Sequence, residues 1–78
     1  MKFNYNKLKG KIVEAYETQA AFAQKMGLSE RTLSLKLNNK RFWKQSEISK
    51  AIKLLHISEE EISVYFFTRE VQNVEPNE

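Results

Sequence analysis

Residues 18–38, with the sequence TQAAFAQKMGLSERTLSLKLN, decide the fold of this 78-residue chain. Apolar residues recur in this stretch at helical spacing in two sets, Phe22, Ala23 and Met26, then Leu33 and Leu37. Gly27 lies between the two sets and can adopt a positive φ without steric strain. The spacing therefore predicts two short helices joined by a sharp turn, the helix-turn-helix arrangement.

Polar residues that cap helices support this interpretation and extend it. Thr18 and Ser29 precede the two helices and are good N-cap types, and Ser46 is placed to cap a further helix that runs to about residue 55. Ser58 lies three residues before Glu61, the spacing of a capping box, which predicts the start of a last helix.

The remaining apolar residues complete a single small domain. Four of them have helical spacing ahead of the central stretch: Tyr5, Leu8, Ile12 and Tyr16. With the helices at about 46–55 and from residue 58, the sequence predicts an all-α domain of five short helices over residues 1–67. We expect a flexible tail over 68–78, where Val71 and Val74 follow no helical or strand period.

Composition excludes most chemistry. The chain has no Cys and no Asp, one His and two Gly, so it cannot form a Ser-His-Asp triad, a thiol nucleophile or a Gly-rich phosphate loop. The same residue counts argue against a metal site. We therefore expect no enzymatic activity and no cofactor. No apolar run could span a bilayer and no signal peptide is evident, so we expect a cytoplasmic protein with no membrane partner.

Charge is distributed unevenly along the chain. Residues 1–44 contain ten Lys or Arg and three Glu, a net charge of +7, whereas residues 45–78 contain three basic residues and seven Glu, a net charge of −4. A basic half suits a polyanion such as nucleic acid, although a solvated surface can also segregate in this way.

The stretch from Gln19 to Asn38 resembles the helix-turn-helix of the phage repressor and Cro family. Phe42-Trp-Lys-Gln-Ser-Glu-Ile48 and Glu61-Ile-Ser-Val-Tyr-Phe-Phe67 are similar to small regulators encoded by phages of Gram-positive bacteria. The resemblance covers about residues 3–72. It implies a five-helix lambda-repressor-like DNA-binding domain, with the recognition helix 29–38 in the major groove of a double-stranded DNA operator.

The chain departs from the family at Lys36, where an apolar residue is usual. On a helix that turns about 100° per residue, Leu33 and Leu37 face the core while Arg31, Leu35 and Asn38 lie opposite. We therefore expect Leu35 to be exposed. The alternative is that the helix rolls to bury Leu35 while Lys36 extends its amine to solvent.

These positions define the candidate DNA contacts. Leu35 could pack on a thymine methyl and Arg31 could reach a guanine edge or a phosphate, while the family arrangement implies a phosphate contact for Gln19. Basic residues after the helix favour further phosphate contacts. The full candidate set is Gln19, Ser29, Arg31, Thr32, Ser34, Leu35, Asn38, Lys40, Arg41 and Lys44.

Aromatic residues outside the central stretch have other expected roles. We expect Phe42 to lie in the core, while Trp43 either covers the core edge or lies near DNA. Four large residues end the last helix, more than a small core easily buries: Val64, Tyr65, Phe66 and Phe67. An exposed remainder there would form a homodimer interface, and the alternative is that all four are core.

Two functions fit these features. The first is a Cro-like transcriptional repressor that binds an operator sequence-specifically. The alternative is a phage antirepressor or modulator that binds a partner repressor protein through its helix-turn-helix surface. A DNA reader needs the polar and basic candidates exposed together, whereas a protein binder would use exposed Leu35, Phe42 or Trp43 as anchors.

Overall fold

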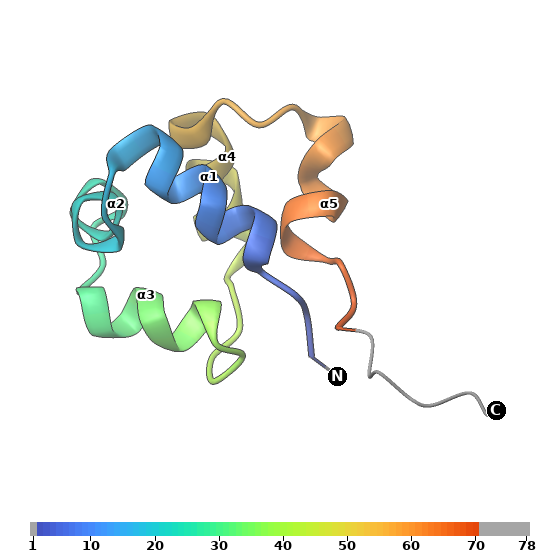
Figure 1. Cartoon of the computed structure of the whole chain (residues 1–78), viewed down its shortest axis with the longest axis horizontal. Helices are drawn as coiled ribbons and strands as arrows, with labels where there is room; N and C mark the ends of the chain where they lie inside the picture. The colour runs from blue at the N-terminus through green and yellow to red at the C-terminus, as the bar shows by residue number, and fades with distance from the viewer. Residues whose placement is uncertain (1, 71–78) are drawn as a thin grey trace, which may run out of the picture.

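Five α-helices form the chain in the computed structural model, which describes residues 2–70 (Figure 1). Their bounds are Asn6–Tyr16 (α1), Gln19–Met26 (α2), Glu30–Leu37 (α3), Gln45–Leu55 (α4) and Ile62–Phe66 (α5), with a 3-10 turn at Glu59–Glu61. No strand occurs among the described residues apart from one isolated β-bridge. The prediction of an all-α chain with five short helices is confirmed.

The turn between α2 and α3 has the predicted local structure. Gly27 has a φ of 77°, in the left-handed region, and ends α2. Thr18 Oγ1 accepts a hydrogen bond from the Ala21 N–H at 3.0 Å. Ser29 Oγ accepts one from the Thr32 N–H, also at 3.0 Å. These side chains satisfy amides at the first turns of α2 and α3, so each helix begins at the predicted residue.

The expected cap of α4 is wrong. Lys44 rather than Ser46 is the N-cap, and Ser46 lies inside the first turn of the helix. The Lys44 N–H donates to Glu47 Oε1 at 2.8 Å, so a carboxylate three residues along supplies the acceptor. Helix α4 therefore starts earlier than a serine cap would place it.

The last helix begins where expected but in two parts. Glu61 Oε1 accepts a hydrogen bond from the Ser58 N–H at 3.4 Å, as the capping-box spacing predicts. The three glutamates that follow Ser58 form the 3-10 turn, and regular α-helix starts only at Ile62.

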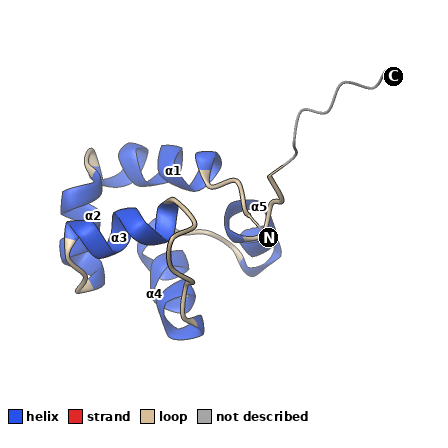
Figure 2. Cartoon of the chain, turned by 90° about the horizontal axis from the view of Figure 1, so that it is seen from below, coloured by secondary structure: helices blue, strands red, loops and turns tan. Residues whose placement is uncertain are grey.

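The core is built by residues from all five helices and from the segments just before α1 and just after α4. Helix α2 packs against α1, α3 and α4, while α1 also packs against α4 and α5 (Figures 1 and 2). Leu33 is fully buried, as predicted for a residue that faces the core. The buried apolar residues are Tyr5, Leu8, Ile12, Phe22, Ala23, Met26, Leu33, Leu37, Ala51, Leu55, Ile57 and Phe66. A core of this size is small, so each buried side chain carries much of the stability.

The two ends of the described chain lie side by side. Phe3 and Arg69 form an antiparallel bridge, with hydrogen bonds from the Asn4 N–H to the Thr68 carbonyl (2.7 Å) and from the Glu70 N–H to the Lys2 carbonyl (3.0 Å). Most of the expected tail, including Val71 and Val74, lies outside the described residues. None of the described helices has the length and apolar character needed to cross a membrane.

The two serines offer a matched test of the helix starts. Ser29→Ala should lower the free energy of unfolding by about 1 kcal/mol, because it removes the acceptor for the Thr32 N–H. Ser46→Ala should change it by less than about 0.5 kcal/mol, because Ser46 caps nothing. Urea denaturation followed by circular dichroism measures both. A loss of similar size in the Ser46 variant would contradict the assigned start of α4.

Candidate interaction surface

The ten candidate contact residues lie on α2, on α3 and in the segment that leads into α4. Six are exposed: Ser29, Arg31, Asn38, Lys40, Arg41 and Lys44. Four are half-buried: Gln19, Thr32, Ser34 and Leu35. We call Ser29, Arg31, Asn38, Lys40, Arg41 and Phe42 the α3–loop surface, since all six are exposed residues of α3, its two caps or the loop after it.

Several polar groups on α3 are already used within the helix. Ser29 Oγ donates to Thr32 Oγ1 at 2.9 Å. Asn38 Nδ2 donates to the Ser34 carbonyl at 2.8 Å and to Ser34 Oγ at 3.3 Å. Arg31 has no salt bridge within residues 2–70. Arg31 is therefore the main uncommitted donor on the outer face of α3.

The orientation of α3 differs from both sequence alternatives. Leu35 was expected to be exposed, but it is half-buried, and Lys36 is buried at 4% exposure. The amine of Lys36 does not extend to solvent, because it finds an acceptor on α4 and another on the loop. Helix α3 therefore packs against the core even though Lys36 stands where the phage repressor and Cro family usually has an apolar residue.

Lys36 is held by two partners. Lys36 Nζ lies 2.9 Å from Glu47 Oε1 and donates to the Phe42 carbonyl, also at 2.9 Å. The same Glu47 oxygen accepts the Lys44 N–H. The side chains of Lys36 and Glu47 are 5% and 15% exposed. One ion pair thus joins the last turn of α3, the loop and the first turn of α4.

The environment of Glu47 shifts its acidity. Burial raises the pKa of the Glu47 carboxyl, but hydrogen bonds from the Lys44 N–H and the Lys36 amine, with the charges of both lysines, outweigh burial. The net effect is a pKa below the ordinary value of 4.5. Glu47 is therefore an anion at neutral pH, which the cap and the ion pair both require.

The expectation that Phe42 lies in the core is wrong. Phe42 is 89% exposed, more than the other exposed large hydrophobic residues of the described chain. Trp43 fills the place instead, half-buried at the core edge with its ring 5.1 Å from Phe66 in an edge-to-face arrangement. Of the two neighbouring aromatic residues, only Trp43 packs against the core.

The loop between α3 and α4 is tied down along its length. The Leu35 carbonyl accepts the N–H groups of Lys40 (2.8 Å) and Arg41 (3.2 Å). Asn39 has a φ of 63°, and its side-chain amide pairs with the Phe3 backbone through two hydrogen bonds of 2.9 Å. The loop that carries Phe42 is thus fixed to α3 on one side and to the N-terminal segment on the other.

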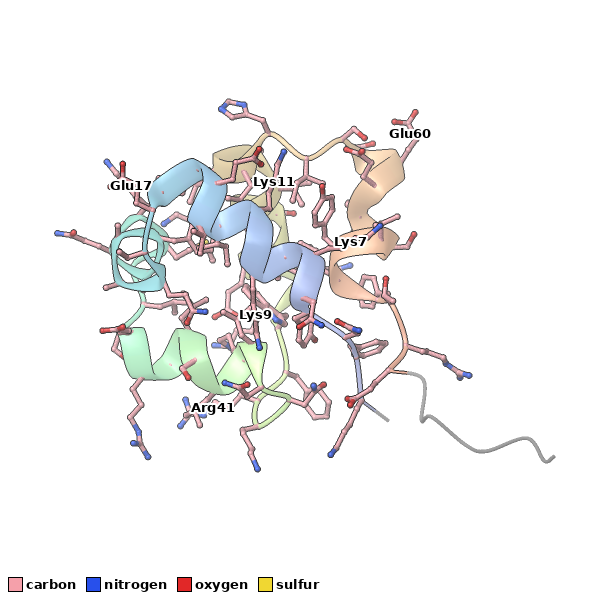
Figure 3. All side chains as sticks on the ribbon, in the orientation of Figure 1. Lys7, Lys9, Lys11, Glu17, Arg41 and Glu60 are labelled. Atoms are coloured by element: carbon pink, nitrogen blue, oxygen red, sulfur yellow. The ribbon has the colours of Figure 1, made fainter. Side chains whose placement is uncertain are left out.

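The charged residues of the two halves of the sequence are partly separated in space. Arg41 lies at the α3 end of the molecule, and Glu60 lies at the opposite end, beside the start of α5 (Figure 3). Lys9 points from α1 toward α3, where it lines a polar cavity of about 260 Å³ with Asn38 and Glu70. Lys7, from the same basic half of the sequence, points toward α5 instead, so the basic residues are spread over more than one side of the molecule (Figure 3).

Sequence reasoning missed the Lys36–Glu47 pair and the exposure of Phe42. One signal was present in the sequence: Lys36 stands at a position that is usually apolar, and a buried lysine requires a carboxylate. Glu47 at the third position of the next helix was the available partner. No sequence pattern distinguished Phe42 from Trp43 as the buried aromatic.

The lowered pKa of Glu47 predicts a pH dependence of stability. A carboxyl with a depressed pKa contributes stability that is complete above its unfolded value and is lost as the pH falls through the folded value. At about pH 7, Glu47→Gln should lower the free energy of unfolding by about 2 kcal/mol. This loss is smaller than the loss expected from breaking a fully buried ion pair, because the Glu47 side chain keeps some contact with solvent. The difference between wild type and variant should shrink below about pH 4.5 in urea denaturation. An equal difference at neutral and acidic pH would contradict the role of the Glu47 charge.

Comparisons with known proteins place the chain in a family and beside one phage regulator. The family model described as "Protein of unknown function (DUF739)" matches residues 1–69. The chain is 50% identical to the modulator of repression (MOR) of the temperate bacteriophage TP901-1 from Lactococcus lactis, whose solution structure covers 92% of this chain and 97% of its own with a TM-score of 0.76. No curated protein matches the chain.

These similarities refine the resemblance noted from the sequence. The solved relative is a phage protein named for its role in repression, which agrees with the predicted class of small phage regulators. Membership of the Cro and repressor helix-turn-helix family stays a prediction. Because the family model spans nearly the whole described chain, the chain belongs to the DUF739 family.

Proposed function

We propose that this chain is a modulator of repression that binds a partner repressor protein through its α3–loop surface. The observation that carries the proposal is the 50% identity to the modulator of repression of phage TP901-1 over 92% of the chain. Identity at this level supports a shared role as well as a shared fold, and the similarity extends over nearly the whole of both chains. The proposal requires neither catalysis nor a cofactor.

The chemistry of the α3–loop surface supports a protein partner. The side-chain nitrogen of Asn38 is bonded to Ser34, and Leu35 is partly buried, so α3 offers few free groups for base edges. Phe42, in contrast, presents a whole aromatic ring to solvent. Aromatic and Arg side chains are the residue types that most often anchor protein interfaces.

Direct operator binding is the second candidate, and the charge of the surface favours it. Arg31, Lys40 and Arg41 are exposed together with no carboxylate between Lys40 and Lys44. Such a cluster suits phosphate contacts, with α3 in the major groove and α2 across the backbone. In this case the exposed Val64 of α5 and Phe67 directly after it, at 39% and 49%, would supply the dimer interface that paired half-sites need.

Titration with two probes separates the candidates. The first probe is the purified repressor encoded in the same genome as this chain, and its binding is measured by calorimetry. The second probe is a set of DNA duplexes selected from a random pool, and their binding is measured by fluorescence anisotropy. We expect a saturable complex with the repressor, and only weak duplex binding that disappears with added salt and enriches no sequence.

A matched pair of arginine variants locates the surface. Arg31→Ala should weaken repressor binding about tenfold, since Arg31 is the uncommitted donor of α3. Arg69→Ala removes an exposed arginine at the end of the described chain, outside this surface, and should bind like wild type. Enrichment of a palindromic duplex without any repressor complex would overturn the proposal in favour of operator binding.

A further inference from the structure

Phe42 combines features that an ordinary loop residue does not. Its ring is 89% exposed, although an aromatic side chain gains by burial. Lys40, Arg41 and Lys44 surround it in sequence, and all three are exposed. Residues 40–44 contain no carboxylate, Glu47 just after them is bonded to Lys36 and to the Lys44 N–H, and Glu70 lines the cavity beside Asn38 and Asn39. The ring therefore lies among cations with no exposed anion beside it in the loop.

The backbone beneath the ring is fixed. The Phe42 carbonyl accepts a hydrogen bond from the buried Lys36 amine, and the two residues before Phe42 donate their N–H groups to the Leu35 carbonyl. Trp43, the next residue, is packed against Phe66. A partner that buries the ring would thus order one side chain and little backbone, which reduces the entropy lost on binding.

Lys36 has no evident reason to be charged for folding alone. A buried ion pair is often no more stabilising than apolar side chains of similar size, because both charges lose their hydration. The Lys36 amine, however, reaches the Phe42 carbonyl, which an apolar side chain could not bind. The pair therefore has a structural effect that is separate from stability: it fixes the position of the loop.

We propose that Phe42 is the anchor of the α3–loop surface, that it fits an apolar pocket rimmed by carboxylates on the repressor, and that Lys36 and Glu47 are positioning residues for it. This inference rests on the proposed function and names the chemistry of the partner. A protein pocket is favoured over DNA because a duplex has no preformed apolar cavity, so an aromatic side chain that enters it must first unstack a base step. The exposed cations around the ring complement a rim of acidic side chains.

The first experiment compares two exposed phenylalanines. Phe42→Ala should weaken binding to the repressor encoded in the same genome about 30-fold by calorimetry, with an unchanged Tm because the ring contributes little to the core. Phe67→Ala removes an exposed ring at the end of α5 and should keep wild-type affinity. Replacing Lys40 and Arg41 by Gln should slow association more than it speeds dissociation, because rim charges mainly steer the encounter.

The second experiment tests whether Lys36 and Glu47 act through the ring. The double variant Lys36→Met with Glu47→Gln keeps an acceptor for the Lys44 N–H but removes the bond to the Phe42 carbonyl. We expect folded protein with several-fold weaker repressor binding. In the Phe42→Ala background the same two substitutions should have no further effect, because there is no ring left to position.

The outcomes separate this inference from the proposed function. Repressor binding by wild type with unchanged affinity in Phe42→Ala would overturn the inference and leave the proposed function standing. An equal loss from the Lys36 and Glu47 substitutions with and without the ring would overturn their positioning role. Failure of the wild-type chain to bind the repressor would overturn both proposals. Both would also be overturned if Phe42→Ala weakened duplex binding and left repressor binding unchanged.

Discussion

The ion pair between Lys36 and Glu47 is the interaction on which the arrangement of α3, the loop and α4 depends. The lysine is almost fully buried, so the fold must supply acceptors for its amine, and it does so from two different elements. Glu47 in turn caps α4 through the Lys44 N–H. One pair of charges therefore couples the start of α4, the path of the loop and the packing of α3 against the core.

That coupling also decides which aromatic residue is buried. With the Phe42 carbonyl held by Lys36, the chain turns so that the next side chain, Trp43, enters the space beside Phe66 and Tyr5. Phe42 is left outside on a backbone that cannot easily turn it inward. The exposed ring thus stands on a backbone held by the buried Lys36 amine and by α3, not on a loose loop.

Local signals in the sequence predicted the helices well, because helix caps and apolar spacing act over three or four residues. Thr18, Gly27 and Ser29 each have their expected roles. The cap of α4 and the exposure of Leu35 and Phe42 were not predictable in this way. The cap of α4 is a local contact, but Lys44 is not a usual N-cap residue type. The burial of Lys36 and the path of the loop with Phe42 involve contacts of Lys36 with residues 6 and 11 positions further along, which no periodicity encodes. The candidate contact residues stay predictions, although the structure places most of them at the surface.

The same two-helix unit can serve a DNA partner or a protein partner, and the difference lies in what its surface leaves uncommitted. A base reader requires polar side chains free to meet base edges, yet the α3 amide and hydroxyls here are largely bonded to one another. A protein binder requires a rigid apolar contact within a polar rim, which Phe42 and its basic neighbours provide. A chain of 78 residues has a small core. Because buried polar contacts hold its loop in place, the chain can present the Phe42 ring rigidly without further secondary structure.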